Sequence, residues 1–99
     1  MSDLKKIRRT VSDYFGDIVT VKKLEETGGS KTVTQAKAVG VYVARKEGNE
    51  YEDIAKIFGY ANERSVSRVF TKVNEEMSYG GTVQRDVNAV AEKLGIDLD

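Results

Sequence analysis

The stretch Tyr51–Val73, YEDIAKIFGYANERSVSRVFTKV, predicts two amphipathic helices joined by a short turn. In its first part apolar residues recur at i, i+3, i+4 and i+7, which places them on one side of a helix: Tyr51, Ile54, Ala55 and Phe58. Gly59 should end this helix, because glycine enters the left-handed region without a Cβ penalty. Asn62 offers an N-cap oxygen for a second helix that runs to about Met77. The apolar side of the second helix consists of Val66, Val69, Phe70, Val73 and Met77.

The outer side of the second helix carries a basic row. Its members, at i, i+4 and i+8, are Arg64, Arg68 and Lys72. A pair of helices whose second member presents such a row to solvent is the arrangement that places a recognition helix in the DNA major groove. Short hydroxyl side chains at Ser65 and Thr71 can also donate to phosphates. The alternative interpretation is an ordinary solvated helix face.

A second candidate region begins at the run EETGGSK, residues 25–31, which predicts a loop. A helix should follow it from Thr34, or alternatively from Thr32, and end at Gly48. At or near the start of this helix, unpaired N–H groups and the helix dipole favour a phosphate. The residues concerned are Lys31, Thr34, Gln35 and Lys37. The alternative here is an N-cap accompanied by two ordinary surface lysines.

The N-terminal part of the chain also has helical spacing. Ser2 or Asp3 can cap a first helix that ends at Gly16, and Thr20 can cap a helical turn through Leu24. The apolar residues on one side of the first helix are Leu4, Ile7, Val11, Tyr14 and Phe15. No segment here is long enough to predict a strand.

The remaining helix boundaries follow from capping patterns. Asn49 with Glu52 has the form of a capping box at the start of the Tyr51 helix. Thr82 is expected to cap a last helix, and Gly95 followed by apolar Ile96 predicts a Schellman-type end. Five helices and one helical turn, with no convincing strand, predict a single compact all-α domain over residues 1–99.

Composition narrows the class of function. The 99 residues are 39% hydrophobic and 32% charged, as in soluble globular domains, and no apolar run approaches the roughly 20 residues of a membrane span. The charged N-terminus lacks a signal-peptide core, so we expect a cytoplasmic protein without membrane contact. There is no Cys and no His, which excludes disulfides, triad catalysis and the commonest metal ligand. We therefore expect neither an enzyme nor a metal or cofactor. Most aromatic residues fall at inward positions, whereas Tyr60, in the turn, is expected to be exposed.

The neutral net charge conceals an uneven distribution. Residues 31–73 carry a net charge of +3, and residues 74–99 carry a net charge of −4. Binding to nucleic acid through bulk charge alone is therefore not expected. A local basic surface remains compatible with this distribution.

From about Ile7 to Leu94 the chain resembles the C-terminal DNA-binding domain of DnaA, the family of bacterial chromosomal replication initiators. The similar parts are IRRTVSDYF at residues 7–15, VTQAKAVGVYVAR at 33–45 and EDIAKIFGYANERSVSRVFTKV at 52–73. The resemblance implies a helix–turn–helix of Trp-repressor-like fold. It also implies a double-stranded DNA partner, a recognition helix at about residues 62–77, and a role in replication or transcription regulation.

The chain departs from the family where the family reads DNA. The segment aligned with the family's base-reading residues is Asn62, Glu63, Arg64 and Ser65. The family's basic loop aligns with residues 25–29, which include two glutamates, and its minor-groove arginine aligns with Gln35. The family's DNA site is therefore not transferred to this chain.

The leading hypothesis is sequence-specific DNA binding, with bases read between Asn62 and Arg68. An arginine there can pair bidentately with guanine, and Asn62 with adenine. Glu63 can accept from cytosine, or instead stabilise the helix start electrostatically. Lys31, Lys37 and Lys72 would contact phosphates. The alternative is a protein-interaction module that keeps the fold and has lost DNA affinity. The sequence specifies neither the DNA site nor the oligomeric state.

Overall fold

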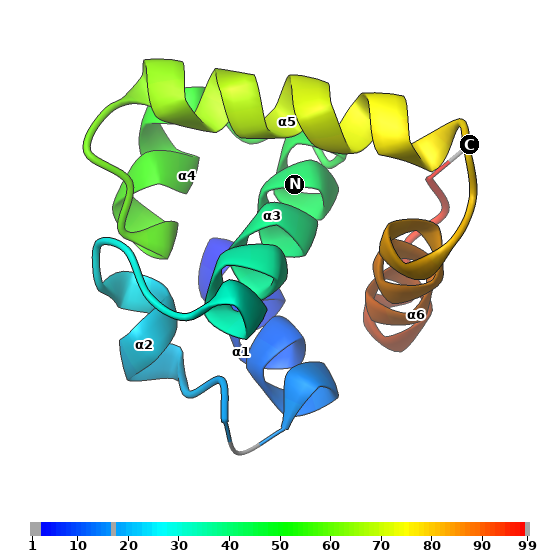
Figure 1. Ribbon diagram of the computed structural model, residues 1–99, viewed down its shortest axis with the longest axis horizontal. Coiled ribbons are helices and arrows are strands. Elements are labelled where there is room, and N and C mark those ends of the chain that lie inside the picture. Colours follow the sequence, from blue (N-terminus) through cyan, green and yellow to red (C-terminus); the bar gives the residue numbers. More distant parts are fainter. Residues whose placement is uncertain (1–2, 17, 99) are drawn as a thin grey trace.

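The computed structural model describes residues 3–16 and 18–98, which form six helices and no strand (Figure 1). The helices are α1 Leu4–Phe15, α2 Val21–Glu25, α3 Lys31–Lys46, α4 Tyr51–Phe58, α5 Glu63–Met77 and α6 Thr82–Leu94. The prediction of an all-α fold is confirmed. Within the described ranges, no helix has both the length and the apolar character needed to cross a membrane.

Helix α3 is the centre of the fold, since it packs against each of the other five helices. In Figure 1, α5 crosses the bundle on one side of α3, and α6 lies well apart from α2. A helix surrounded in this way is buried on more than one face. Its buried residues are Val33, Ala36, Lys37, Val39, Gly40, Val41, Tyr42, Val43 and Ala44. Apolar spacing in the sequence predicts an inner side that comprises only Ala36, Val39, Tyr42 and Val43, and this prediction is too narrow.

The predicted pair of helices and the turn between them are confirmed as α4 and α5. Gly59 ends α4 in the left-handed region (φ 69°, ψ 32°), and the N–H of Tyr60 donates to Ala55 O at 2.9 Å. A Cβ at position 59 would overlap the carbonyl group of Glu25, so tertiary packing also requires glycine there. Asn62 caps α5, as predicted, by accepting from the N–H of Ser65.

Three other predicted helix ends are also confirmed. Asp3 caps α1 by accepting from Lys5 N at 2.9 Å, and Thr20 caps α2 by accepting from Lys23 N at 3.1 Å. Ser2, the alternative cap of α1, lies outside the described residues. The Schellman end of α6 is present, because the N–H of Ile96 donates five residues back at 2.9 Å.

The predicted start of α3 was wrong. The helix begins at Lys31 and its N-cap is Ser30, whose Oγ accepts from Val33 N at 3.3 Å. Thr34 already lies within the first turn, where its N–H donates to Ser30 O at 2.9 Å. Ser30, Thr32 and Thr34 all carry an oxygen suited to capping, and the earliest of them is used.

The capping box predicted at Asn49 and Glu52 is absent. Glu50 is the N-cap of α4 and makes no side-chain capping bond. Asn49 is buried and instead closes the end of α3, with its Nδ2 donating to Ala44 O at 3.0 Å. The prediction for Thr82 was also wrong, since this residue is the first of α6 rather than its cap.

Helix α4 approaches α3 closely at one point. Phe58 is fully buried and its ring lies against Gly40, in the middle of α3. A Cβ built on Gly40 would overlap the ring. Glycine in this helix therefore serves close packing rather than a turn.

We expect the substitution Gly40→Ala to lower the free energy of unfolding by about 1–3 kcal/mol, the usual cost of overpacking a core. Glycine to alanine in a helix otherwise adds about 1 kcal/mol of stability, so propensity alone predicts the opposite sign. Equilibrium unfolding in urea measures the change. In a Phe58→Leu background the loss should shrink, because the clashing ring is gone. A Gly40→Ala protein as stable as the parent would contradict this packing argument.

Candidate nucleic-acid interface

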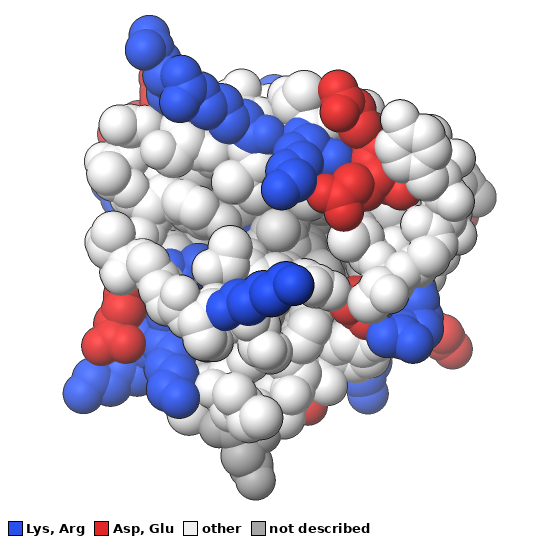
Figure 2. Space-filling model, viewed as in Figure 1, with Lys and Arg blue, Asp and Glu red and all other residues white. Residues whose placement is uncertain are grey.

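The predicted basic row lies on the exposed side of α5. Arg64, Arg68 and Lys72 are all exposed, and none has an ion-pair partner within residues 3–16 and 18–98. Basic side chains follow one another over the region of α5 in Figure 2, and acidic side chains lie near the C-terminal end of the helix. The surface is therefore locally basic along α5 but is not a continuous positive field.

At the start of α5, Asn62 has a structural task. Its Oδ1 accepts from the backbone N–H of Ser65 at 3.0 Å and from the Ser65 hydroxyl at 3.2 Å. A bidentate contact to adenine needs the amide oxygen and nitrogen together. The oxygen is engaged in the cap, so the geometry argues against the predicted contact between Asn62 and adenine. Ser65, which is half-buried, supports the same cap.

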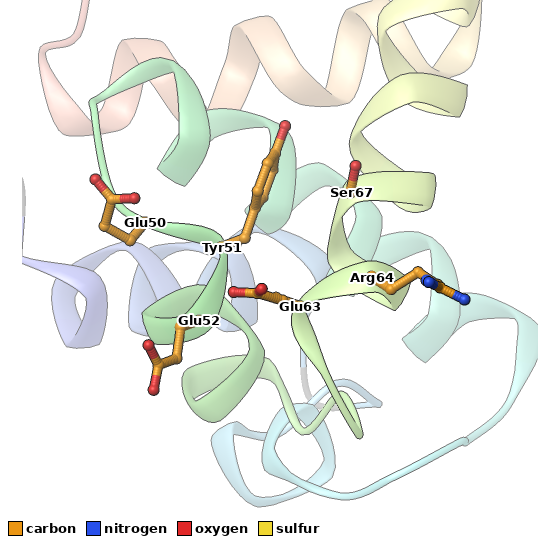
Figure 3. A pocket seen from close by; sticks show the side chains of 6 residues that line it. All are labelled: Glu50, Tyr51, Glu52, Glu63, Arg64 and Ser67. Carbon is orange, nitrogen blue, oxygen red and sulfur yellow. The ribbon is translucent and has the colours of Figure 1, made fainter.

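Glu63 belongs to an acidic group beside the first turn of α4. Figure 3 shows its carboxylate directed toward the α4 side, whereas the guanidinium of Arg64 points the other way. The two residues border a cavity of 440 Å³ whose other lining residues are Glu50, Tyr51, Glu52 and Ser67. We call Glu50, Glu52 and Glu63 the acidic corner. Glu63 also lies in the first turn of α5, where a negative charge stabilises the helix dipole.

Residues at the start of α3 and at the end of the basic row line one groove. Lys31 and Thr34 are exposed, and with Lys72 they line a groove of 290 Å³ between α3, α5 and α6. Like Lys72, Lys31 has no ion-pair partner in the part of the chain that the structure describes. The structure thus brings together basic residues that are 41 positions apart in the sequence.

Gln35, also on α3, is half-buried and engaged within the protein. Its Nε2 donates to Asp86 Oδ2 at 3.0 Å, and the hydroxyl of Tyr14 donates to Asp86 Oδ1 at 2.7 Å. The hydrogen bond to Asp86, followed by burial, raises the pKa of Tyr14. These hydrogen bonds connect α1, α3 and α6, and they were not predicted from the sequence. The available signal was that Asp86 lies three residues after Val83, on the inner side of α6.

Lys37 is not a surface residue. It is 3% exposed, and its ammonium group donates to the carbonyl oxygens of Glu26 and Gly28. Burial lowers the pKa of Lys37, and the nearby Glu26 carboxylate partly opposes that shift. The expectation of a surface lysine is wrong, and the ammonium cannot reach a phosphate in this conformation. Lys37 lies four residues after Val33 and three before Gly40, so the three residues share one face of α3, which the structure shows to be buried.

Tyr60 is half-buried, contrary to the expectation of an exposed ring. Tyr60 lines the groove between α3, α5 and α6, and its ring centroid lies 5.6 Å from Nζ of the buried Lys37. Burial raises the pKa of Tyr60 to about 12. The turn between α4 and α5 therefore contributes to the core as well as to the surface.

Comparison with known proteins finds a similarity to part of a longer protein. The chain is similar to part of DnaA. Over 92 residues it is 24% identical to the chromosomal replication initiator protein DnaA of Streptococcus mutans serotype c (strain ATCC 700610 / UA159). The match covers 92% of this chain and 20% of that protein, so the chain spans about a fifth of its length. No protein-family model matches the chain.

The raised pKa of Tyr60 predicts a loss of stability at alkaline pH. Above the ordinary pKa of 10.0 the unfolded state loses this proton first, whereas the folded state keeps it until about pH 12. The unfolded state then binds fewer protons, so stability falls as pH rises through this window. Between pH 9 and pH 11 we expect the parent to lose about 1 kcal/mol more than a Tyr60→Phe variant. Urea unfolding of both proteins across this range measures the difference. Parallel profiles would refute the burial of the hydroxyl.

Proposed function

We propose that this protein binds double-stranded DNA, with α4 and α5 acting as a helix–turn–helix and α5 entering the major groove. The observation that carries the proposal is the row Arg64, Arg68 and Lys72, exposed on the second helix of the pair and without ion-pair partners among the described residues. The major groove, about 12 Å wide, admits such a helix. Similarity to DnaA over 92% of the chain supports the same function, and with it a Trp-repressor-like architecture.

The contacts would divide between bases and phosphates. Arg64 and Arg68 extend from the exposed side of α5, and each can pair bidentately with guanine O6 and N7. Lys72 and Lys31, on either side of the groove, would contact phosphates, which fixes register without reading sequence. In this proposal Thr34 lies within reach of the same DNA backbone. Asn62 and Ser65 keep the start of α5 ordered through the capping hydrogen bonds.

The acidic corner limits how DNA can approach. Glu50 and Glu52 at the start of α4, with Glu63 beside them, repel phosphates on that side. The DNA backbone would therefore run nearer to Lys72 and Lys31 than to α4. Such a module would act as a replication-related factor or as a transcription regulator.

A protein-interaction module is the second candidate, and the acidic corner is the observation that favours it. With Lys37 buried, the α3 side also has less positive charge than the sequence indicates. A salt titration with mixed-sequence duplex separates the two functions, because binding through several phosphates weakens steeply with salt. No duplex binding at low salt would favour the protein partner.

We expect Arg68→Ala to weaken binding to a selected site by about 1–3 kcal/mol, and Lys72→Ala to weaken all duplexes similarly while reducing the salt slope by about 1. A selection from a random duplex pool supplies the site, and fluorescence anisotropy supplies the affinities. Arg9→Ala is the charge-matched control, because Arg9 is exposed on α1, which does not contact α5. Equal affinity of all three variants and the parent would refute the proposed interface.

A further inference from the structure

The groove between α3, α5 and α6 has the composition of a small-molecule site. Its volume of 290 Å³ is near the lower end of ligand pockets, which span about 300–1,000 Å³. Its apolar lining consists of Ala38, Val39, Tyr60, Val69, Val73 and Val83. Such pockets bind the apolar body of a ligand, and a few polar groups at the rim fix its orientation.

The rim of the groove selects for negative charge. Its basic groups, Lys31 and Lys72, lie on opposite helices, are exposed and have no ion-pair partner among the described residues. Gln35 lines the same space, but its amide is engaged by Asp86. Glu76 is the acidic group among the lining residues, so the charged rim is positive in sum.

We propose that this groove binds a small organic anion that has an apolar, preferably aromatic, body and one carboxylate. The body would lie on the valines between α3 and α5, and the carboxylate would lie between Lys31 and Lys72. A cation of the same shape would meet two ammonium groups, and a neutral molecule would gain nothing from them. A protein segment would find room for little more than one side chain in this volume.

The proposed ligand would also regulate DNA binding. Lys31 and Lys72 are the residues assigned above to phosphates, so a carboxylate between them would compete with the DNA backbone. This consequence depends on the proposed function. Occupation of the groove by the ligand does not.

The probes for the test are 1-naphthoate and its neutral analogue 1-naphthamide, added to the full chain and followed by amide NMR shifts. We expect saturable shifts around Val39, Val69 and Val73 with naphthoate, and about fivefold weaker binding of naphthamide, since exposed ion pairs contribute up to about 1 kcal/mol. Lys72→Gln should reduce that preference, because only Lys31 then faces the carboxylate. Ala38→Leu should fill the groove and abolish binding of both probes.

Lys72→Gln changes an exposed residue, so the test does not depend on Ala38→Leu being folded. Shifts scattered over the surface lysines, equal binding of the two probes, or no saturation would overturn the proposal. A duplex competition assay then separates the two ideas. DNA binding with no effect of naphthoate on the groove residues refutes the ligand site and leaves the proposed function in place. Saturable groove binding without any duplex binding supports the ligand site and refutes the proposed function.

Discussion

The contact between the Phe58 ring and the backbone of Gly40 sets the position of the helices around it. Because the ring occupies the space that a Cβ at position 40 would need, α4 lies directly on the middle of α3. The chain then turns at Gly59, whose own Cβ space is taken by the carbonyl group of Glu25. α5 starts from this constrained point, so its direction across the bundle follows from two close approaches that only glycine permits (Figure 1).

Buried polar groups fix the elements on either side of this contact. The ammonium of Lys37 binds carbonyl oxygens of the loop before α3, and the carboxylate of Asp86 accepts hydrogen bonds from α1 and α3. Burial of a charge is costly unless hydrogen bonds compensate for it, and both groups have such bonds. Each of them joins separate segments of the chain through hydrogen bonds. As a result, the side chains of Lys37 and Gln35, which the sequence assigns to a predicted DNA interface, are engaged in hydrogen bonds within the protein.

The sequence predicted features that local spacing determines and missed those that depend on tertiary contacts. Apolar periodicity gave both helices of the pair, and the turn at Gly59 and the cap at Asn62 each rest on a few neighbouring residues. The start of α3 was misplaced because three hydroxyl residues at alternate positions, Ser30, Thr32 and Thr34, carry the same local signal. The role of Asn49 was missed since its partner, Ala44 O, belongs to the preceding helix end rather than to α4. Exposure of the basic row was predictable, whereas the loss of Lys37 from the surface was hidden by its charge.

The two sides of α5 carry charges of opposite sign, and this asymmetry constrains any anionic partner. The acidic corner lies beside the start of α4, while Lys31 and Lys72 frame the groove on the α3 side. Exposed charges interact over about 8 Å at physiological ionic strength, so each side acts largely on its own surroundings. A phosphate and a carboxylate would therefore favour the same two lysines for the same electrostatic reason. Since both lysines are flexible and exposed, neither anion gains much from them alone, and the contact that discriminates must come from elsewhere. For the proposed DNA complex that contact would be Arg64 and Arg68 on base edges, and for the proposed small anion it would be the apolar floor of the groove.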